Sequence, residues 1–219
     1  TLRSAAASLQ NYTPELAQAV REGESKTDHY EDILGTYLVK LSALKISESD
    51  SSEAAMLLKA LSDFERIGDH ALNILESAEE LKGKNLSLSD AARHELSVLL
   101  RAVDEIVDMT FQAFRDDDLE KAYRVEPLEQ VIDDLKEKMR IHHILRMQQG
   151  SCSIESGFVW SDLLTALERV GDHCSNIAGC IIDLHHHNMN THEAIRSARM
   201  ENENFDDEYK AYAVKYSLK

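Results

Sequence analysis

The stretch LSDFERIGDHALNI at residues 61–74 decides the fold, because it recurs as LTALERVGDHCSNI at residues 164–177. The glutamate, arginine, glycine, aspartate, histidine and asparagine keep their places, 103 positions further along the chain. A self-match of this quality within 219 residues indicates an internal duplication. We therefore expect two related halves with the same local fold.

The composition favours α-helices and excludes several classes of partner. Only two prolines and eight glycines occur, and a chain of this length buries roughly 70% of its unfolded surface, enough for a real core. The formal net charge of −16 argues against nucleic acid and anionic membrane surfaces as partners, because both require basic patches.

The three cysteines, Cys152, Cys174 and Cys180, lack CxxC spacing, which argues against disulfides and thiolate zinc sites and fits a reducing cytoplasm. The sequence shows no signal peptide and no run of about 18 apolar residues. It begins at Thr1 and not at a methionine, so one expectation is that it is a fragment of a protein with a membrane-embedded part.

Apolar periodicity and capping residues predict six long helices in two groups of three. The first three predicted helices cover residues 2–21, 24–46 and 53–82. The fourth starts at the capping residues Ser89 and Asp90 and ends before the turn at 116–118. The fifth covers 119–148, and the sixth follows the loop at 150–157 and ends near 183. Pro14 should interrupt the first helix, Gly23 should end it, and Pro127 should kink the fifth. The second helix carries an apolar stripe of Ile33, Tyr37, Leu38, Leu41 and Leu44.

The expected fold is all-α, a tandem duplication of a three-helix bundle with six long helices and a short C-terminal tail. The predicted domains are residues 1–87, residues 88–187 and a polar tail at 188–219. Within that tail, Tyr209, Tyr212, Val214 and Tyr216 are spaced for a short helix that packs back on the bundle.

Each copy of the motif carries two carboxylates four residues apart, Glu65 with Asp69 and Glu168 with Asp172. On a helix these pairs fall within about 40° of one another and border the apolar stripe. Like charges at this spacing repel by a few tenths of a kcal/mol, and the cost grows as water leaves. A bound cation would remove that cost.

A second acidic pair precedes each motif, 41 residues earlier in the first half and 39 earlier in the second. An antiparallel helix hairpin would bring the early pair against the later one. Four carboxylates per half, without a thiolate, suit Mg, Ca, Mn or iron, and zinc is also a candidate. The predicted metal ligands are Glu24, Asp28, Glu65, Asp69, Glu129, Asp133, Glu168 and Asp172.

A purely structural interpretation competes with this one. The acids would then be rim charges paired with arginines on neighbouring helices, and the duplication would repeat packing residues without any ligand. His70 and His173 are expected on a flank of their helices rather than as ligands, and Asn73 and Asn176 are candidates for hydrogen bonds between helices. No nucleophile setting, P-loop or dinucleotide fingerprint is present, and no histidine follows a glutamate by three residues as di-iron bundles require. We expect no enzyme.

At these residues the sequence resembles the PhoU family. FERIGDHALNI at 64–74 and LERVGDHCSNI at 167–177 match its later motif, and the earlier acidic pairs match as well, so the resemblance covers residues 1–187. It implies two tandem three-helix bundles that bind multinuclear iron or zinc clusters through the acids, and a role in regulating phosphate transport. One departure is Gly179, which stands where the first half has Glu76.

More narrowly, VEPLE at 125–129 and YKAYAVKYSL at 209–218 resemble the cytoplasmic C-terminal PhoU-like domain of bacterial Na/Pi cotransporter family proteins. This resemblance implies a non-enzymatic regulatory domain at the inner face of the membrane. Its partner would be a membrane-embedded phosphate transporter, in the same polypeptide or separate, and a second copy of the chain, forming a homo-oligomer, is a further candidate partner. The alternatives are a free-standing adaptor that acts on an ABC phosphate transporter and a sensor kinase, and a helical interaction module without metal.

Overall fold

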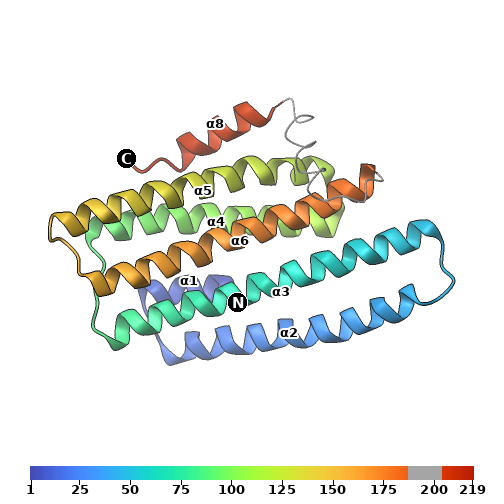
Figure 1. Cartoon of the computed structure of the whole chain (residues 1–219), viewed down its shortest axis with the longest axis horizontal. Helices are drawn as coiled ribbons and strands as arrows, with labels where there is room; N and C mark the ends of the chain where they lie inside the picture. The colour runs from blue at the N-terminus through green and yellow to red at the C-terminus, as the bar shows by residue number, and fades with distance from the viewer. Residues whose placement is uncertain (187–203) are drawn as a thin grey trace.

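Seven α-helices account for most of residues 1–186 and 204–219, the residues that the computed structural model describes (Figure 1). They are α1 (Leu2–Gln10), α2 (Pro14–Ser42), α3 (Glu48–Gly83), α4 (Asp90–Asp116), α5 (Leu119–Gln148), α6 (Ile154–His186) and α8 (Phe205–Lys215). The all-α prediction and the two three-helix groups, α1–α3 and α4–α6, are confirmed. The predicted domain boundaries stay predictions.

The two halves meet along α3 and α6, the helices that carry the repeated motif. Figure 1 shows the α2–α3 pair on one side of α6 and the α4–α5 pair on the other. The core runs continuously through this joint, with fully buried Ile74 and Leu75 from α3 and Leu163 and Leu167 from α6. Within the described residues, no helix has both the length and the apolar character needed to cross a membrane.

Side-chain caps start α2, α3, α4 and α5, and two of these helices begin earlier than predicted: α2 at Pro14 instead of residue 24, and α3 at Glu48 instead of residue 53. The Thr13 hydroxyl accepts a hydrogen bond from the Leu16 amide with Pro14 in the first turn, and Ser47 forms a capping box with Asp50. Such caps satisfy backbone amides that have no partner inside the helix. Pro127 lies inside α5, which continues on both sides of it.

The predicted helix break at Gly23 is wrong, because α2 runs without interruption from Pro14 to Ser42. Gly23 serves a close helix approach instead. A Cβ atom at this position would lie 2.2 Å from Oγ1 of Thr1, at the start of α1. Glycine lets the two helices meet here, at a cost in helix propensity of about 1 kcal/mol.

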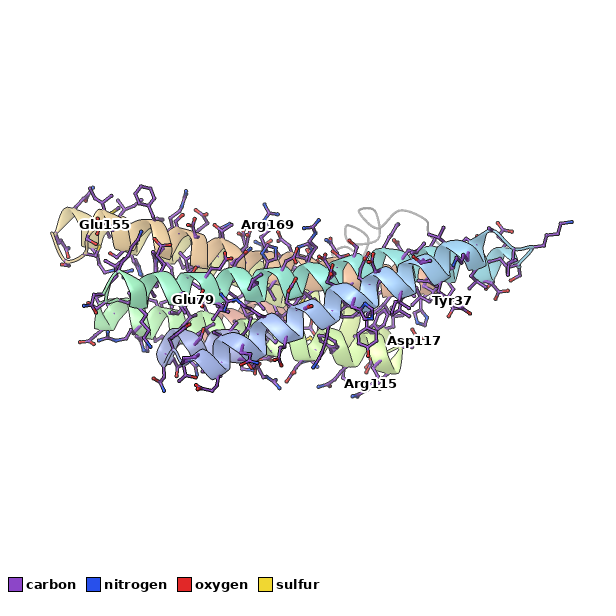
Figure 2. All side chains as sticks on the ribbon, turned by 90° about the horizontal axis from the view of Figure 1, so that it is seen from below. Tyr37, Glu79, Arg115, Asp117, Glu155 and Arg169 are labelled. Carbon is purple, nitrogen blue, oxygen red and sulfur yellow. The ribbon has the colours of Figure 1, made fainter. Side chains whose placement is uncertain are left out.

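The apolar stripe predicted for the second helix is helical but mostly exposed. Of its members Leu38 is buried, whereas Tyr37 is 61% exposed and Ile33 and Leu44 are also exposed (Figure 2). The reason is that α1, with 9 residues, is too short to cover the 29 residues of α2, whereas the corresponding helix of the second half, α4, has 27 residues.

The C-terminal stretch forms α8, which lies along α5 (Figure 1). Tyr212 and Tyr216 are buried, and the Tyr209 hydroxyl donates a hydrogen bond to Asp134. The Tyr216 hydroxyl and Lys215 both bind Glu105 of α4. The prediction of a short helix that packs back on the bundle is therefore confirmed for residues 205–215. The preceding part of the predicted tail, 188–203, lies outside the described residues.

Candidate metal centre

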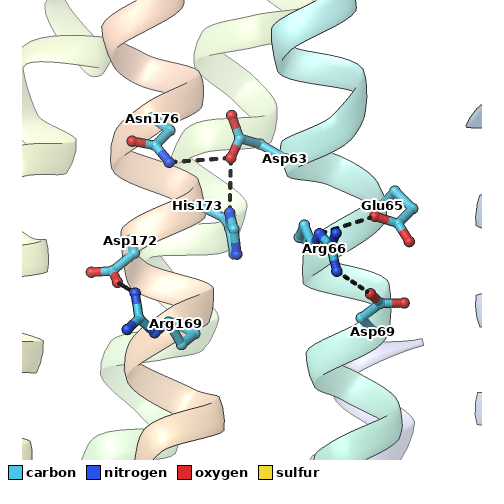
Figure 3. Close-up of polar contacts among 8 residues, drawn as sticks. All are labelled: Asp63, Glu65, Arg66, Asp69, Arg169, Asp172, His173 and Asn176. Atoms are coloured by element: carbon cyan, nitrogen blue, oxygen red, sulfur yellow. Dashed lines mark hydrogen bonds and ion pairs between the residues drawn. The ribbon is translucent and has the colours of Figure 1, made fainter. Parts of the chain in front are cut away.

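The motif carboxylates of α3 lie half-buried and share one arginine (Figure 3). Arg66 Nη1 is 3.1 Å from Asp69 Oδ2, and Arg66 Nε is 3.6 Å from Glu65 Oε2. Burial, followed by the negative charge of Asp69, raises the pKa of Glu65. Because the Arg66 side chain is 58% exposed, its ion pairs contribute little to stability and are easily exchanged.

The motif of α6 repeats this arrangement. Arg169 Nη1 is 3.0 Å from Asp172 Oδ2, and Arg169 Nε is 3.9 Å from Glu168 Oε2. Burial, followed by the charge of Glu168, raises the pKa of Asp172. In both halves the arginine partner stands on the same helix as the acids, whereas the structural interpretation placed it on a neighbouring helix.

Glu168 has a second partner that sequence reasoning missed. Lys136 of α5 reaches across with Nζ 2.9 Å from Glu168 Oε1. The other oxygen, Glu168 Oε2, is buried, lies 3.9 Å from Arg169 Nε, and accepts no hydrogen bond from the residues that the structure describes. A buried carboxylate oxygen left in this state is costly, which makes it a candidate ligand for a cation.

The earlier acidic pairs lie on the helices that pack directly against the motifs. A Cβ atom at Gly68 would lie 3.6 Å from Thr27, the neighbour of Asp28 on α2. A Cβ atom at Gly171 would lie 3.5 Å from Ile132 and 3.9 Å from Cγ of Glu129, both on α5. The helix hairpins thus bring each early pair to the level of its motif, as the spacing predicts.

The structure does not close these acids into a coordination shell. Across residues 1–186 and 204–219, no group of three His, Cys, Asp or Glu side chains converges as metal ligands. Glu24, Asp28, Glu65 and Asp69 in one half, and Glu129, Asp133, Glu168 and Asp172 in the other, remain predicted ligands. The donor set fits a hard cation, because it consists of carboxylate oxygens and includes a Glu168 oxygen that accepts no hydrogen bond from the described residues.

The motif histidines have a different place, at the joint between the halves. The rings of His70 and His173 stack with their centroids 5.4 Å apart. His173 Nδ1 lies 2.8 Å from Asp63 Oδ1, and the Asn176 amide donates to the same oxygen at 3.2 Å (Figure 3).

The hydrogen bond expected of Asn176 between helices is therefore confirmed. Burial, followed by the neighbouring His173, lowers the pKa of His70. Sequence reasoning missed Asp63, although the sequence holds one signal: its counterpart in the second copy of the motif is Ala166.

The PhoU domain family matches residues 1–78 and again 96–181. The chain belongs to the PhoU family. The double match confirms both the duplication and the family resemblance seen in the motifs. The Serratia marcescens relative is named a phosphate-specific transport system accessory protein, and membership of this non-enzymatic family agrees with the prediction that the chain is not an enzyme.

Several curated and solved relatives extend the match. The PhoU homolog 1 of Thermotoga maritima, named a phosphate-specific transport system accessory protein, is 33% identical over 131 residues, covering 58% of this chain. The chain spans about half of that relative, 53% of its length. PhoU of Escherichia coli is 25% identical over 182 residues, covering 80% of this chain and 72% of the relative.

The crystal structure of PhoU from Pseudomonas aeruginosa superposes with a TM-score of 0.79 at 25% identity, covering 85% of this chain and 88% of that chain. A second solved PhoU, from Streptococcus pneumoniae, shares the fold with a TM-score of 0.71 at 21% identity.

Proposed function

We propose that this chain is a PhoU-type accessory protein that regulates a phosphate transport system and acts without enzymatic chemistry. The observation that carries the proposal is the match of the PhoU domain to both halves, together with relatives named for the phosphate-specific transport system. These names favour the free-standing adaptor over the cotransporter domain that the narrower resemblance suggested. The proposed partner is a membrane-embedded phosphate transporter, reached from the cytoplasmic side.

The second part of the proposal is that the acidic faces of the two halves hold metal ions. Iron and zinc clusters are what the family resemblance implies, and Mg, Mn or Ca would suit carboxylate ligands equally well. A bound ion would compensate the repulsion between the motif acids and connect α3 to α2, and α6 to α5. The support is twofold: burial raises the pKa of the half-buried Glu65 and Asp172 carboxylates, and one buried oxygen of Glu168 accepts no hydrogen bond from the described residues.

The cotransporter domain is the second candidate, and α8 is the observation that favours it. This helix carries most of the YKAYAVKYSL stretch, lies outside the residues matched by the PhoU domain, and nevertheless docks on α5 with two buried tyrosines. The reading frame that encodes Thr1 distinguishes the two candidates. Apolar helices encoded in frame upstream would favour the cotransporter domain, and a start codon near Thr1 would favour the adaptor.

Deletion of the gene in its host tests the regulatory role. We expect the deletion to change the rate of phosphate uptake, and expression of the wild-type protein to restore it. The double variant Glu65→Gln and Glu168→Gln should restore it less well, if the acidic faces serve regulation. An uptake rate that the deletion leaves unchanged would overturn the regulatory proposal.

Elemental analysis of the protein purified without chelator tests the metal proposal separately. Wild type should carry bound metal, and the same double variant should carry less. Wild-type protein without metal, together with a variant of unchanged stability, would leave only the structural interpretation of the acids.

A further inference from the structure

The two halves correspond position by position around their motif glycines. Thr27 lies against Gly68 and Ile132 lies against Gly171, at nearly equal distances. Thr27 and Ile132 are 105 residues apart, which is also the separation of the two early acidic pairs. The α2–α3 and α5–α6 hairpins therefore use the same register, and residues of α2 and α5 can be compared at this offset.

This register places Glu31 of α2 and Lys136 of α5 at the same position with opposite charges. Lys136 forms the 2.9 Å ion pair with Glu168, and the two side chains are only 21% and 13% exposed. Glu31 lies near Glu65, the counterpart of Glu168, and adds its negative charge there. One half thus sets an ammonium group beside its first motif acid, and the other half sets a carboxylate there.

The charge of the two acidic faces differs accordingly. The first half combines five carboxylates on α2 and α3: Glu24, Asp28, Glu31, Glu65 and Asp69. In the described part of the chain, the ion pairs of its two motif acids go to the mostly exposed Arg66. The second half has four corresponding carboxylates, an equally exposed Arg169, and the largely buried Lys136 from the opposing helix.

We propose that Lys136 acts as a built-in cation of the second half, so that the chain loads metal preferentially onto the carboxylates of the first half. This inference rests on the metal binding proposed above and adds an unequal occupancy that neither the motif nor its duplication implies. It assigns to Lys136 the role of a specificity residue.

The physical reason is competition between the ammonium group and the metal ion. Lys136 already compensates part of the repulsion between Glu168 and Asp172. A metal ion entering the second half would have to displace this ammonium group and leave it largely buried without its partner, which is costly. In the first half the ion would displace only an exposed guanidinium.

Glu168 Oε2 accepts no hydrogen bond from the described residues and has only the exposed Arg169 as an ion-pair partner, so the second half keeps one oxygen available to a cation. We therefore expect weaker binding there, not a complete loss. Because a largely buried ion pair must be broken, we expect the second half to bind the metal ion at least about tenfold more weakly than the first half.

Charge exchange between the corresponding positions tests the inference. Wild type, Lys136→Glu and Glu31→Lys are titrated with Mn²⁺, and free Mn²⁺ is followed by electron paramagnetic resonance. Mn²⁺ is the probe because it prefers carboxylate oxygens to thiolates. Lys136→Glu should tighten the weak class of sites about tenfold, and Glu31→Lys should weaken the strong class similarly.

Paired substitutions assign the sites to the halves. In wild type, Glu65→Gln with Asp69→Asn should remove the tight class, and Glu168→Gln with Asp172→Asn should leave it intact. Lys138→Glu, an exposed residue on the same helix with the same charge change, is the matched control. Circular dichroism establishes that each variant is folded.

Two failures can be told apart. If neither wild type nor Lys136→Glu binds Mn²⁺, the proposed metal function itself is wrong. If wild type binds equally in both halves and Lys136→Glu matches the Lys138→Glu control, metal binding stands and the role of Lys136 is wrong.

Discussion

His70 of α3 and His173 of α6 stack at the joint of the two halves, with ring centroids 5.4 Å apart. The same position of the duplicated motif therefore contacts its own counterpart across the molecule, while the motif acids, one and five residues before each histidine, belong to separate faces. One motif therefore does two tasks in each half. Its histidine lies at the joint, joined in the second half by Asn176, and its glutamate and aspartate form the candidate metal site.

Asp63 makes this joint asymmetric, because its counterpart Ala166 has no carboxylate. Replacement of Asp63 by alanine should lower the free energy of unfolding by about 1–3 kcal/mol, since His173 and Asn176 lose the acceptor they share. Urea unfolding measures the change. Asp162→Ala, at an exposed position of α6, is the control and should cost much less. Equal stability losses in the two variants would contradict a special role for Asp63.

Glycine at position 68 is not required by the packing of α2 on α3. A Cβ atom there would make ordinary van der Waals contact with Thr27 at 3.6 Å. Gly68→Ala should therefore raise the stability of the metal-free protein, by up to about 1 kcal/mol from helix propensity. Thermal unfolding in the presence of chelator tests this.

Gly157→Ala is the contrast to Gly68→Ala, because its Cβ atom would lie 2.8 Å from Nε2 of His143. It should destabilise the protein. If Gly68→Ala destabilises equally, the helices pack more closely at this glycine than the structure shows.

The stability of the second half should fall in mild acid through His143 of α5. Burial first, and then the positive charge of Arg146, lower the pKa of His143, and Glu95 opposes this only in part. The unfolded chain keeps the ordinary pKa of about 6.5 and binds a proton that the folded protein resists. The contribution of His143 is therefore lost as the pH falls below that value.

Urea unfolding at pH 7.5 and 5.5 measures this loss. Wild type should lose more stability on acidification than His143→Gln, whereas the exposed His94→Gln should behave like wild type. An identical pH dependence of wild type and His143→Gln would show that His143 does not titrate differently on folding.

The three thiols should differ in their reactivity towards iodoacetamide. Burial raises the pKa of both Cys174 and Cys180 to about 12, while Cys152 lies half-buried in the loop before α6. Because the thiolate is the reactive form, the native protein at pH 8 should be modified quickly at Cys152 alone. Mass spectrometry of the alkylated peptides measures this.

Cys152→Ser should abolish the fast reaction, and urea should expose all three sites in wild type. Rapid alkylation of Cys174 in the native protein would mean that α6 opens readily from the core.

The sequence by itself determined the fold class, the duplication, the motif and most helix boundaries. These features depend on local signals: apolar periodicity, capping residues such as Ser47 and Ser89, and the two copies of one motif. Each signal acts within a few turns of a single helix. The same signals placed the early acidic pairs at the level of the motif acids.

Only the tertiary structure decided what each helix face meets. Periodicity shows that a face is apolar, but not whether another helix covers it, so the exposure of Tyr37 could not be predicted. The contact of Lys136 with Glu168 and the bridge from Asp63 to His173 join residues 32 and 110 positions apart. Such contacts depend on the mutual register of packed helices. That register is set by the whole core, and no single stretch of sequence encodes it.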